Sequence, residues 1–229
     1  MFDAFFLGAL AQLSLLLSGL AVFRIRVPNS VAGDLAAFGG GGLIAAVAMD
    51  LIPGTAALQV AQVAMWMLIG AGTFIAGDKL VGRKFGSEGA GGVLGIVVGS
   101  VVDGVPESII FGIQLARGAS ISAAFIAAVF VSNIPQALAP SAGLAASGWS
   151  WLRVSTLWMR VVLACGAASI LGYVVATAVG GVNGSRMAAF AAGGILAMIT
   201  DSLIPFANER SKRAGLWTVV GFCSALAMT

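Results

Sequence analysis

Four carboxylates lie inside long apolar stretches of this 229-residue chain: Asp50, Asp103, Glu107 and Asp201. An ionisable side chain within a membrane helix is costly, and it usually faces another helix or a cavity, where it marks a route for ions or protons. We therefore take these four positions as the first candidates for chemistry.

Asp103 and Glu107 form the strongest pair. They are four residues apart, so they project from one face of a helix. Two carboxylates this close repel each other unless one is protonated or a cation lies between them. Pro106 cannot donate a backbone hydrogen bond, so a carbonyl one turn earlier becomes available as a further oxygen ligand. The pattern indicates a cation site; an interhelical hydrogen-bonded pair in a scaffold is the alternative.

A second polar group occupies the next apolar stretch and contains Ser132, Asn133, Pro135 and Gln136. Ser132 and Gln136 again share a helix face, and Pro135 again loosens the backbone. Two proline-containing helices with polar groups at mid-depth are typical of an ion or solute pathway near the bilayer midplane. For this second group, a kinked helix that only packs against its neighbours is the alternative.

The remaining candidates are weaker. Asp50 and Asp201 each precede a Leu-Ile-Pro sequence near a helix end, where a helix-end or gating role competes with ion coordination. Cys165 is either a soft metal ligand or a small core residue, because buried cysteine commonly behaves as a small hydrophobic side chain. The sequence contains no histidine, and its two cysteines do not form a disulfide framework.

The composition identifies the environment that must hold these residues. Hydrophobic residues make up 59% of the chain and charged residues 9%, and the mean hydropathy is +1.04. A soluble domain carries roughly a quarter charged residues, so a soluble enzyme is excluded and a polytopic membrane protein is predicted. No nucleophile-and-base pattern predicts an enzyme, and nothing supports nucleic-acid binding. The N-terminus lacks the positive region of a secretory signal, so the first apolar run is expected to be a retained span.

Apolar stretches separated by charged or turn residues predict a single all-α transmembrane domain, residues 1–229, with proline-kinked spans 4 and 5. Its eight spans are expected at about 4–23, 31–52, 56–78, 91–115, 120–144, 161–180, 185–206 and 215–229. The tryptophan-rich segment 149–159 is expected to lie at the membrane interface before span 6.

The distribution of basic residues predicts the orientation. The joints after spans 2, 4 and 6 carry only Arg117 and Arg186. The joints after spans 1, 3, 5 and 7 carry the other ten, which are Arg24, Arg26, Lys79, Arg83, Lys84, Arg153, Arg160, Arg210, Lys212 and Arg213. Because basic joints stay in the cytoplasm, both termini are expected on the outer side.

Several segments resemble the Zrt/Irt-like (ZIP) divalent metal transporters. Residues 102–107, Val-Asp-Gly-Val-Pro-Glu, resemble the His-Asn-x-Pro-Glu motif of the family's fourth span. Residues 132–138, Ser-Asn-Ile-Pro-Gln-Ala-Leu, are similar to the fifth-span His-Asn-Ile-Pro-Glu-Gly-Leu. The Leu-Ile-Pro sequences after Asp50 and Asp201 resemble segments of spans 2 and 7, and residues 165–173 resemble a stretch of span 6. The resemblance covers essentially the whole chain.

The resemblance implies where a metal site would lie. The family's binuclear site falls on Asp103, Gly104, Glu107, Ser132, Asn133, Gln136 and Cys165. Only Glu107 and Asn133 keep the family's residue type, and both metal-binding histidines are replaced. The remaining oxygen ligands suit harder ions such as manganese or magnesium better than zinc. One dication balances two carboxylates, so a mononuclear site is electrically sensible, whereas two dications would leave excess positive charge.

The leading hypothesis is a ZIP-like transporter in a bacterial inner membrane. It would move a divalent cation such as zinc, manganese or iron through spans 4 and 5, and it would hold no prosthetic cofactor. The resemblance implies an elevator-type motion of spans 1, 4, 5 and 6 against spans 2, 3, 7 and 8, and a possible homodimer. One alternative is transport of a non-metal solute, such as an organic cation or a proton. The other is a non-transporting membrane protein whose degenerate site has lost its ion.

Overall fold

The structure is a computed structural model that describes residues 1–85, 90–118, 122–178 and 182–228. Side chains are described for residues 1–80, 100, 104–118, 122–178 and 184–228. Within these residues the chain is helical throughout and contains no strand, which confirms the all-α prediction.

Each predicted span corresponds to a helix or a run of helical segments. The long helices are α1 (Phe2–Ala21), α2 (Asn29–Ala46), α3 (Val60–Phe85), α4 (Ala90–Ala116), α5 (Ala123–Ala146), α6 (Trp151–Ala178) and α7 (Val182–Met198). Shorter segments complete the second, seventh and eighth spans; they are η1 (Val47–Leu51), η2 (Pro53–Thr55), η3 (Ile199–Leu203), α8 (Ile204–Arg210) and α9 (Ala214–Leu226).

Six of these helical runs are long and apolar enough to cross a membrane, by length and composition, within the described residues. They are Phe2–Ala21, Asn29–Thr55, Val60–Leu80, Ala123–Ala146, Trp151–Ala178 and Gly184–Arg210. Two shorter apolar helices, Gly104–Ala116 and Ala214–Leu226, correspond to predicted spans 4 and 8. The chain is therefore a multi-pass membrane protein, and the count of eight spans remains a prediction.

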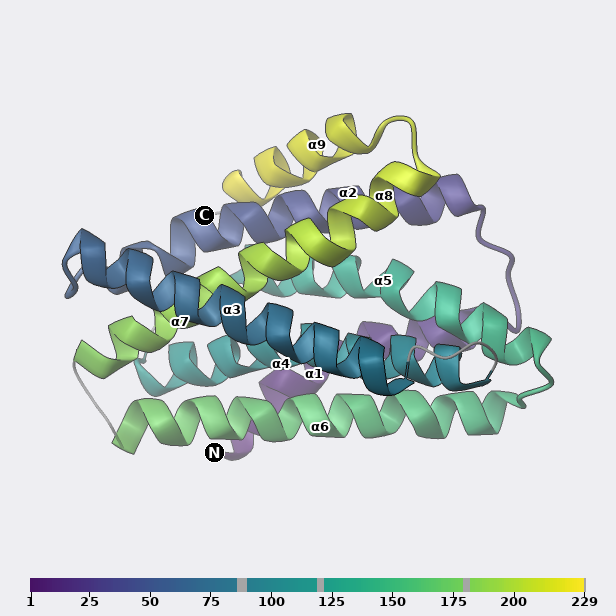
Figure 1. The fold of residues 1–229 in the computed structure, drawn as a ribbon, viewed down its shortest axis with the longest axis horizontal. Helices are drawn as coiled ribbons and strands as arrows, with labels where there is room; N and C mark the ends of the chain where they lie inside the picture. Colours follow the sequence, from purple (N-terminus) through teal and green to yellow (C-terminus); the bar gives the residue numbers. More distant parts are fainter. Residues whose placement is uncertain (86–89, 119–121, 179–181, 229) are drawn as a thin grey trace.

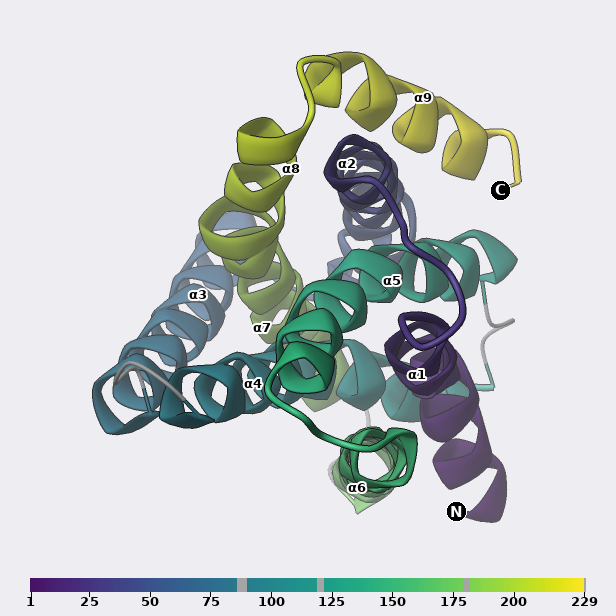
Figure 2. The same ribbon diagram turned by 90° about the vertical axis from the view of Figure 1, so that its right-hand side faces the viewer.

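The helices run roughly along one long axis, with α6 along one side of the molecule and α9 along the other (Figure 1). The view along this axis shows α1, α5 and α6 grouped together, with α2 beside α8 and α9 (Figure 2). Helix α1 packs against both α5 and α6, α4 packs against α6, and α3 packs against α7. Helix α2 lies between α5 and α9 and contacts both. This arrangement surrounds the middle of α4 and α5 with other helices.

Glycines bring α4 and α6 into direct backbone contact. A methyl group at Gly112 would overlap the carbonyl oxygen of Ser169, and a methyl group at Gly172 would overlap that of Ile109. Small residues let membrane helices approach closely enough for van der Waals packing to hold them together. The polar face of α4 is thereby fixed next to α6.

The second and seventh spans both pass through a π-helical turn just before a proline. Segment η1 precedes Pro53, and η3 precedes Pro205. In η1 the amide of Ile52 donates to the carbonyl of Val47, five residues earlier, at 2.9 Å. A proline cannot donate a backbone hydrogen bond, so the carbonyls before it need other arrangements, and a local π turn supplies one.

The sixth span begins earlier than expected. Helix α6 starts at Trp151 rather than near residue 161, because no glycine or proline interrupts residues 151–160 and the Ser150 hydroxyl accepts a hydrogen bond from the amide of Arg153. The interfacial position of 149–159 stays a prediction, and the structure adds that Trp158 packs inside the protein. This side chain is fully buried, and its indole donates to the Ser141 hydroxyl at 2.7 Å.

Candidate polar site between α1, α4 and α5

Glu107 lies in the middle of the bundle, on the face of α4 that points to α1 and α6. Its side chain is 0% exposed. Helix α4 continues through Pro106, so the carboxylate is carried by a regular helix on both sides of the proline. A carboxylate buried this deeply in a membrane protein is a functional candidate, because its desolvation must be compensated by partners.

Gln12 provides one of those partners. It is fully buried at the middle of α1, and its Nε2 donates to Glu107 Oε2 at 3.0 Å. Its Oε1 accepts a hydrogen bond from Nδ2 of Asn133 at 2.7 Å. One amide therefore links α4 and α5, and it connects Glu107 with Asn133.

Gly104 makes this approach possible. A methyl group added at Gly104 would lie 3.3 Å from Gln12 Oε1 and 3.0 Å from Cys165 Sγ, closer than ordinary contact. The absence of a side chain there lets Gln12 and Cys165 reach the backbone of α4. A side chain at this position would therefore have to push Gln12 and Cys165 aside by a few tenths of an ångström.

Helix α5 contributes Asn133, Ser132 and Gln136, and their roles differ. Ser132 is fully buried, donates to the Val129 carbonyl at 2.9 Å and packs against Gly39 of α2. It therefore faces α2 rather than the Gln12 bridge. Asn133 Oδ1 and Gln136 Oε1 are buried oxygen atoms that accept no hydrogen bond from the described residues. Buried acceptors in this condition need a further partner, such as water or a cation.

Cys165 is a core residue, and its role as a metal ligand stays a prediction. It is fully buried and belongs to an apolar cluster with Leu15, Leu144 and Trp158. Its thiol also interacts with Ser108 and Glu107 of α4. Cys165 is therefore a core residue that borders the polar site.

Asp50 and Asp201 lie outside this bridge. The side chain of Asp103 is not among those described. Asp50 is half-buried in η1 and interacts with Ser122, the N-terminal capping residue of α5, whereas Asp201 is exposed in η3. Neither takes part in the hydrogen bonds that join Gln12, Glu107 and Asn133. Both lie in π-helical turns, which are frequent at functional sites.

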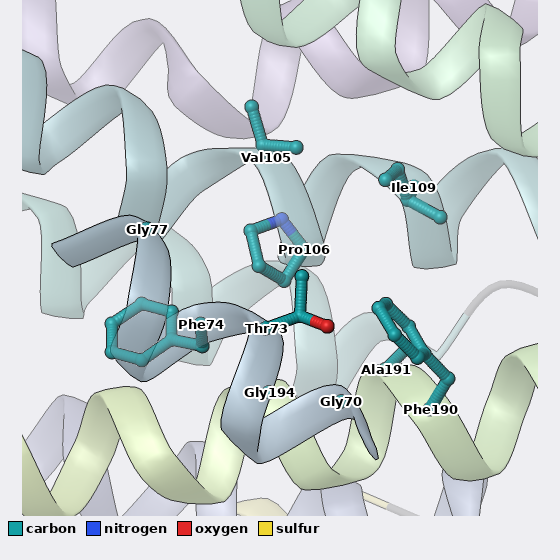
Figure 3. A pocket seen from close by; sticks show the side chains of 10 residues that line it. All are labelled: Gly70, Thr73, Phe74, Gly77, Val105, Pro106, Ile109, Phe190, Ala191 and Gly194. Atoms are coloured by element: carbon teal, nitrogen blue, oxygen red, sulfur yellow. The ribbon is translucent and has the colours of Figure 1, made fainter. Parts of the chain in front are cut away.

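The opposite face of α4 borders an apolar cavity of about 380 Å³. Val105, Pro106 and Ile109 line it from α4, and residues of α3 and α7 line the other sides (Figure 3). Its polar lining is limited to groups such as the Thr73 hydroxyl, which donates to the Ile69 carbonyl at 2.8 Å. The cavity and the Glu107 site thus flank Pro106 on two sides of one helix.

The site can supply oxygen ligands but few charges. Among the residues with described side chains, no group of three or more His, Cys, Asp and Glu residues could hold a metal ion. The described oxygen ligands at the bridge are one carboxylate and two amides, namely Glu107, Gln12 and Asn133, and Gln136 follows three residues along α5. Such oxygen donors suit a hard cation, since zinc prefers nitrogen and sulfur ligands.

Gln12 is the residue that sequence reasoning missed. The search for costly groups in apolar stretches considered ionisable side chains, whereas Gln12 is neutral. An amide in the middle of the apolar run 2–21 is also expensive to bury without partners. Applying the same rule to amides would have identified Gln12 as a candidate.

The sequence was also compared with known proteins. The chain matches no protein-family model, and no curated protein is significantly similar to it.

Proposed function

We propose that this chain is a ZIP-like transporter that moves a divalent cation across the membrane through a site on its fourth and fifth spans. In this proposal eight spans cross the membrane with both termini on the outer side. The carrier helices α1, α4, α5 and α6 slide against α2, α3, α7 and the C-terminal helices. The membrane is a bacterial inner membrane.

One observation carries the proposal. Glu107 and Asn133 are the two implied metal-site positions that keep the family's residue type, they lie on different helices, and a single buried amide bridges them. Sequence similarity alone does not require motif residues from two spans to meet. A shared polar centre deep in the bundle is what a mid-membrane ion site needs.

The charge of the site favours one ion at a time. Glu107 supplies one negative charge, and Asp103, one turn earlier on the same helix, supplies a second. A single dication balances this pair, whereas a second dication would remain uncompensated in a medium of low dielectric constant. Manganese and magnesium fit the oxygen-rich ligand set better than zinc does.

The replacement of Glu107 by Gln tests this function. Glu107→Gln removes the charge but keeps an oxygen that can accept the hydrogen bond from Gln12, so the fold should survive. We expect uptake of Mn²⁺ into proteoliposomes to fall at least about tenfold, since a charged ligand is worth more than 1.4 kcal/mol.

The matched control is Glu209→Gln on α8, where the carboxylate is 71% exposed and pairs only with the adjacent Arg210 within the described residues. This variant should transport as the wild type does. Wild-type uptake by Glu107→Gln, measured on folded protein, would contradict the proposal.

A non-metal substrate is the competing proposal, because the described residues contain only one acidic side chain at the site. An organic cation or a proton needs fewer charged ligands than a dication. This version expects transport that chelators do not affect. Inhibition of uptake by a chelator, and its recovery on adding Mn²⁺, would exclude it.

A further inference from the structure

Gln12 stands in a position that packing alone does not explain. It is fully buried in α1, and its two hydrogen bonds reach two other helices. A neutral amide adds little to helix association in a membrane, where interhelical hydrogen bonds average about 0.6 kcal/mol. An apolar residue at this position would have held the helices together with less desolvation.

Two buried amide oxygens of α5 accept no hydrogen bond from the described residues. Asn133 Oδ1 belongs to the same amide that donates to Gln12, so it lies at the same centre, yet it accepts no hydrogen bond from the described residues. Gln136 Oε1, one turn further along α5, is in the same condition. A network built only for stability satisfies its buried acceptors, because each unpaired acceptor costs about 1–3 kcal/mol. A cation bound at this centre would be such a partner.

We infer that Gln12 is a direct ligand of the transported cation, supplied by α1, and that its amide oxygen biases the site towards hard divalent ions over zinc. This inference rests on the proposed transport function. Gln12 Oε1 accepts one hydrogen bond from Asn133, and its second lone pair can bind the ion while Nε2 still donates to Glu107. The ligand set is then Glu107, Gln12 and the α5 amides, all through oxygen.

The groups at this centre are closely packed against α4. The Gln12 Oε1 atom lies so close to α4 that a methyl group at Gly104 would approach it to 3.3 Å. The nearest soft ligand, Cys165 Sγ, is packed in the apolar cluster with Leu15 and Trp158. Oxygen from Gln12 is thus the accessible ligand on the α1 side.

Exchange of this oxygen for sulfur gives a specific test. Purified full-length wild type and Gln12→Cys are titrated with Mn²⁺ and with Zn²⁺, and the two dissociation constants are measured for each protein. We expect Gln12→Cys to bind Mn²⁺ about tenfold more weakly and to shift the preference towards Zn²⁺ by at least about tenfold, because thiolate favours zinc. The control is Gln62→Cys, which places the same side chain at an exposed position of α3.

Each outcome separates this inference from the proposed function. If folded Gln12→Cys keeps the wild-type ratio of the Mn²⁺ and Zn²⁺ dissociation constants, Gln12 is not a ligand, whether or not the variant loses thermal stability. This result would not contradict the proposed transport function. If Gln12→Cys does not fold, Gln12→Glu replaces it. This variant should bind Mn²⁺ about tenfold more tightly than wild type through its added charge, and unchanged affinity would refute the role. Wild type that binds no divalent ion would contradict the proposed function itself.

Discussion

At the scale of single residues, two buried interhelical hydrogen bonds have different consequences. The bond from Asn133 to Gln12 lies in the polar centre between α1 and α5. The bond from Trp158 to Ser141 joins α6 to α5 inside an apolar cluster. Both are 2.7 Å long and fully buried, so they differ mainly in their surroundings. They therefore form a natural comparison between a site residue and a structural residue.

We expect Asn133→Ala to lower both stability and ion affinity, because it removes a donor to Gln12 and a ligand oxygen. Trp158→Phe should lower stability by a similar amount, about 1 kcal/mol for a lost buried hydrogen bond, and leave Mn²⁺ affinity unchanged. Thermal unfolding and ion titration of the purified variants measure the two effects. Equal ion affinity in both variants would remove Asn133 from the site.

At the scale of helices, two adjacent glycines of α7 differ in how closely the neighbouring helices approach them. A methyl group at Gly193 would overlap the carbonyl oxygen of Met67, so the two backbones touch there. One residue later, a methyl group at Gly194 would lie 3.8 Å from the Gly70 carbonyl oxygen and 3.9 Å from Pro106 Cβ, at ordinary contact distance. Gly194 lines the apolar cavity beside α4 (Figure 3).

Replacement of each of these adjacent glycines by alanine should change the stability of the protein differently. Gly193→Ala forces α3 and α7 apart and should destabilise the protein by about 1–3 kcal/mol, as overpacking does. Gly194→Ala places a methyl group at ordinary contact distance from its neighbours and should be neutral or stabilising by up to about 1 kcal/mol. The unfolding temperatures of both variants, measured in one detergent, provide the check. Equal destabilisation would mean that α4 lies closer to α7 than described.

At the scale of the whole molecule, basic side chains gather at one end of the bundle. The connections α1–α2, α5–α6 and α8–α9 lie at the end that faces the viewer in Figure 2. Arg213 of the α8–α9 connection bonds Asp34 of α2 at 2.9 Å, and Ser211 also donates to Asp34. At the other end, Arg117 donates to the Gly54 carbonyl at 3.3 Å and to Ser185 at 3.1 Å. For the connections named here, the fold thus separates the joints that the positive-inside rule distinguished.

The orientation in the membrane follows as a testable expectation. In a background that lacks the exposed Cys223, Gln59→Cys reports on the joint between α2 and α3, and Lys212→Cys reports on the joint between α8 and α9. A membrane-impermeant maleimide added to intact cells should label Gln59→Cys and should label Lys212→Cys only after permeabilisation. The reverse pattern would place both termini in the cytoplasm.

The sequence by itself determined the all-helical class, the approximate helix positions and the pattern of basic joints, because hydropathy and charge act along the chain. It also identified Glu107 and Asn133 as candidates through their spacing to Pro106 and Pro135. The early start of α6 and the burial of Trp158 were not predictable, since tryptophan suits both an interface and a packed core.

Only the tertiary structure decided which polar groups meet. It brought Gln12, 95 residues from Glu107 and 121 from Asn133, between the two motif helices. It turned Ser132 towards α2, and it left Asp50 and Asp201 outside the bridge. These contacts depend on which face each helix turns towards its neighbours. Close glycine contacts between segments far apart in the sequence fix those faces.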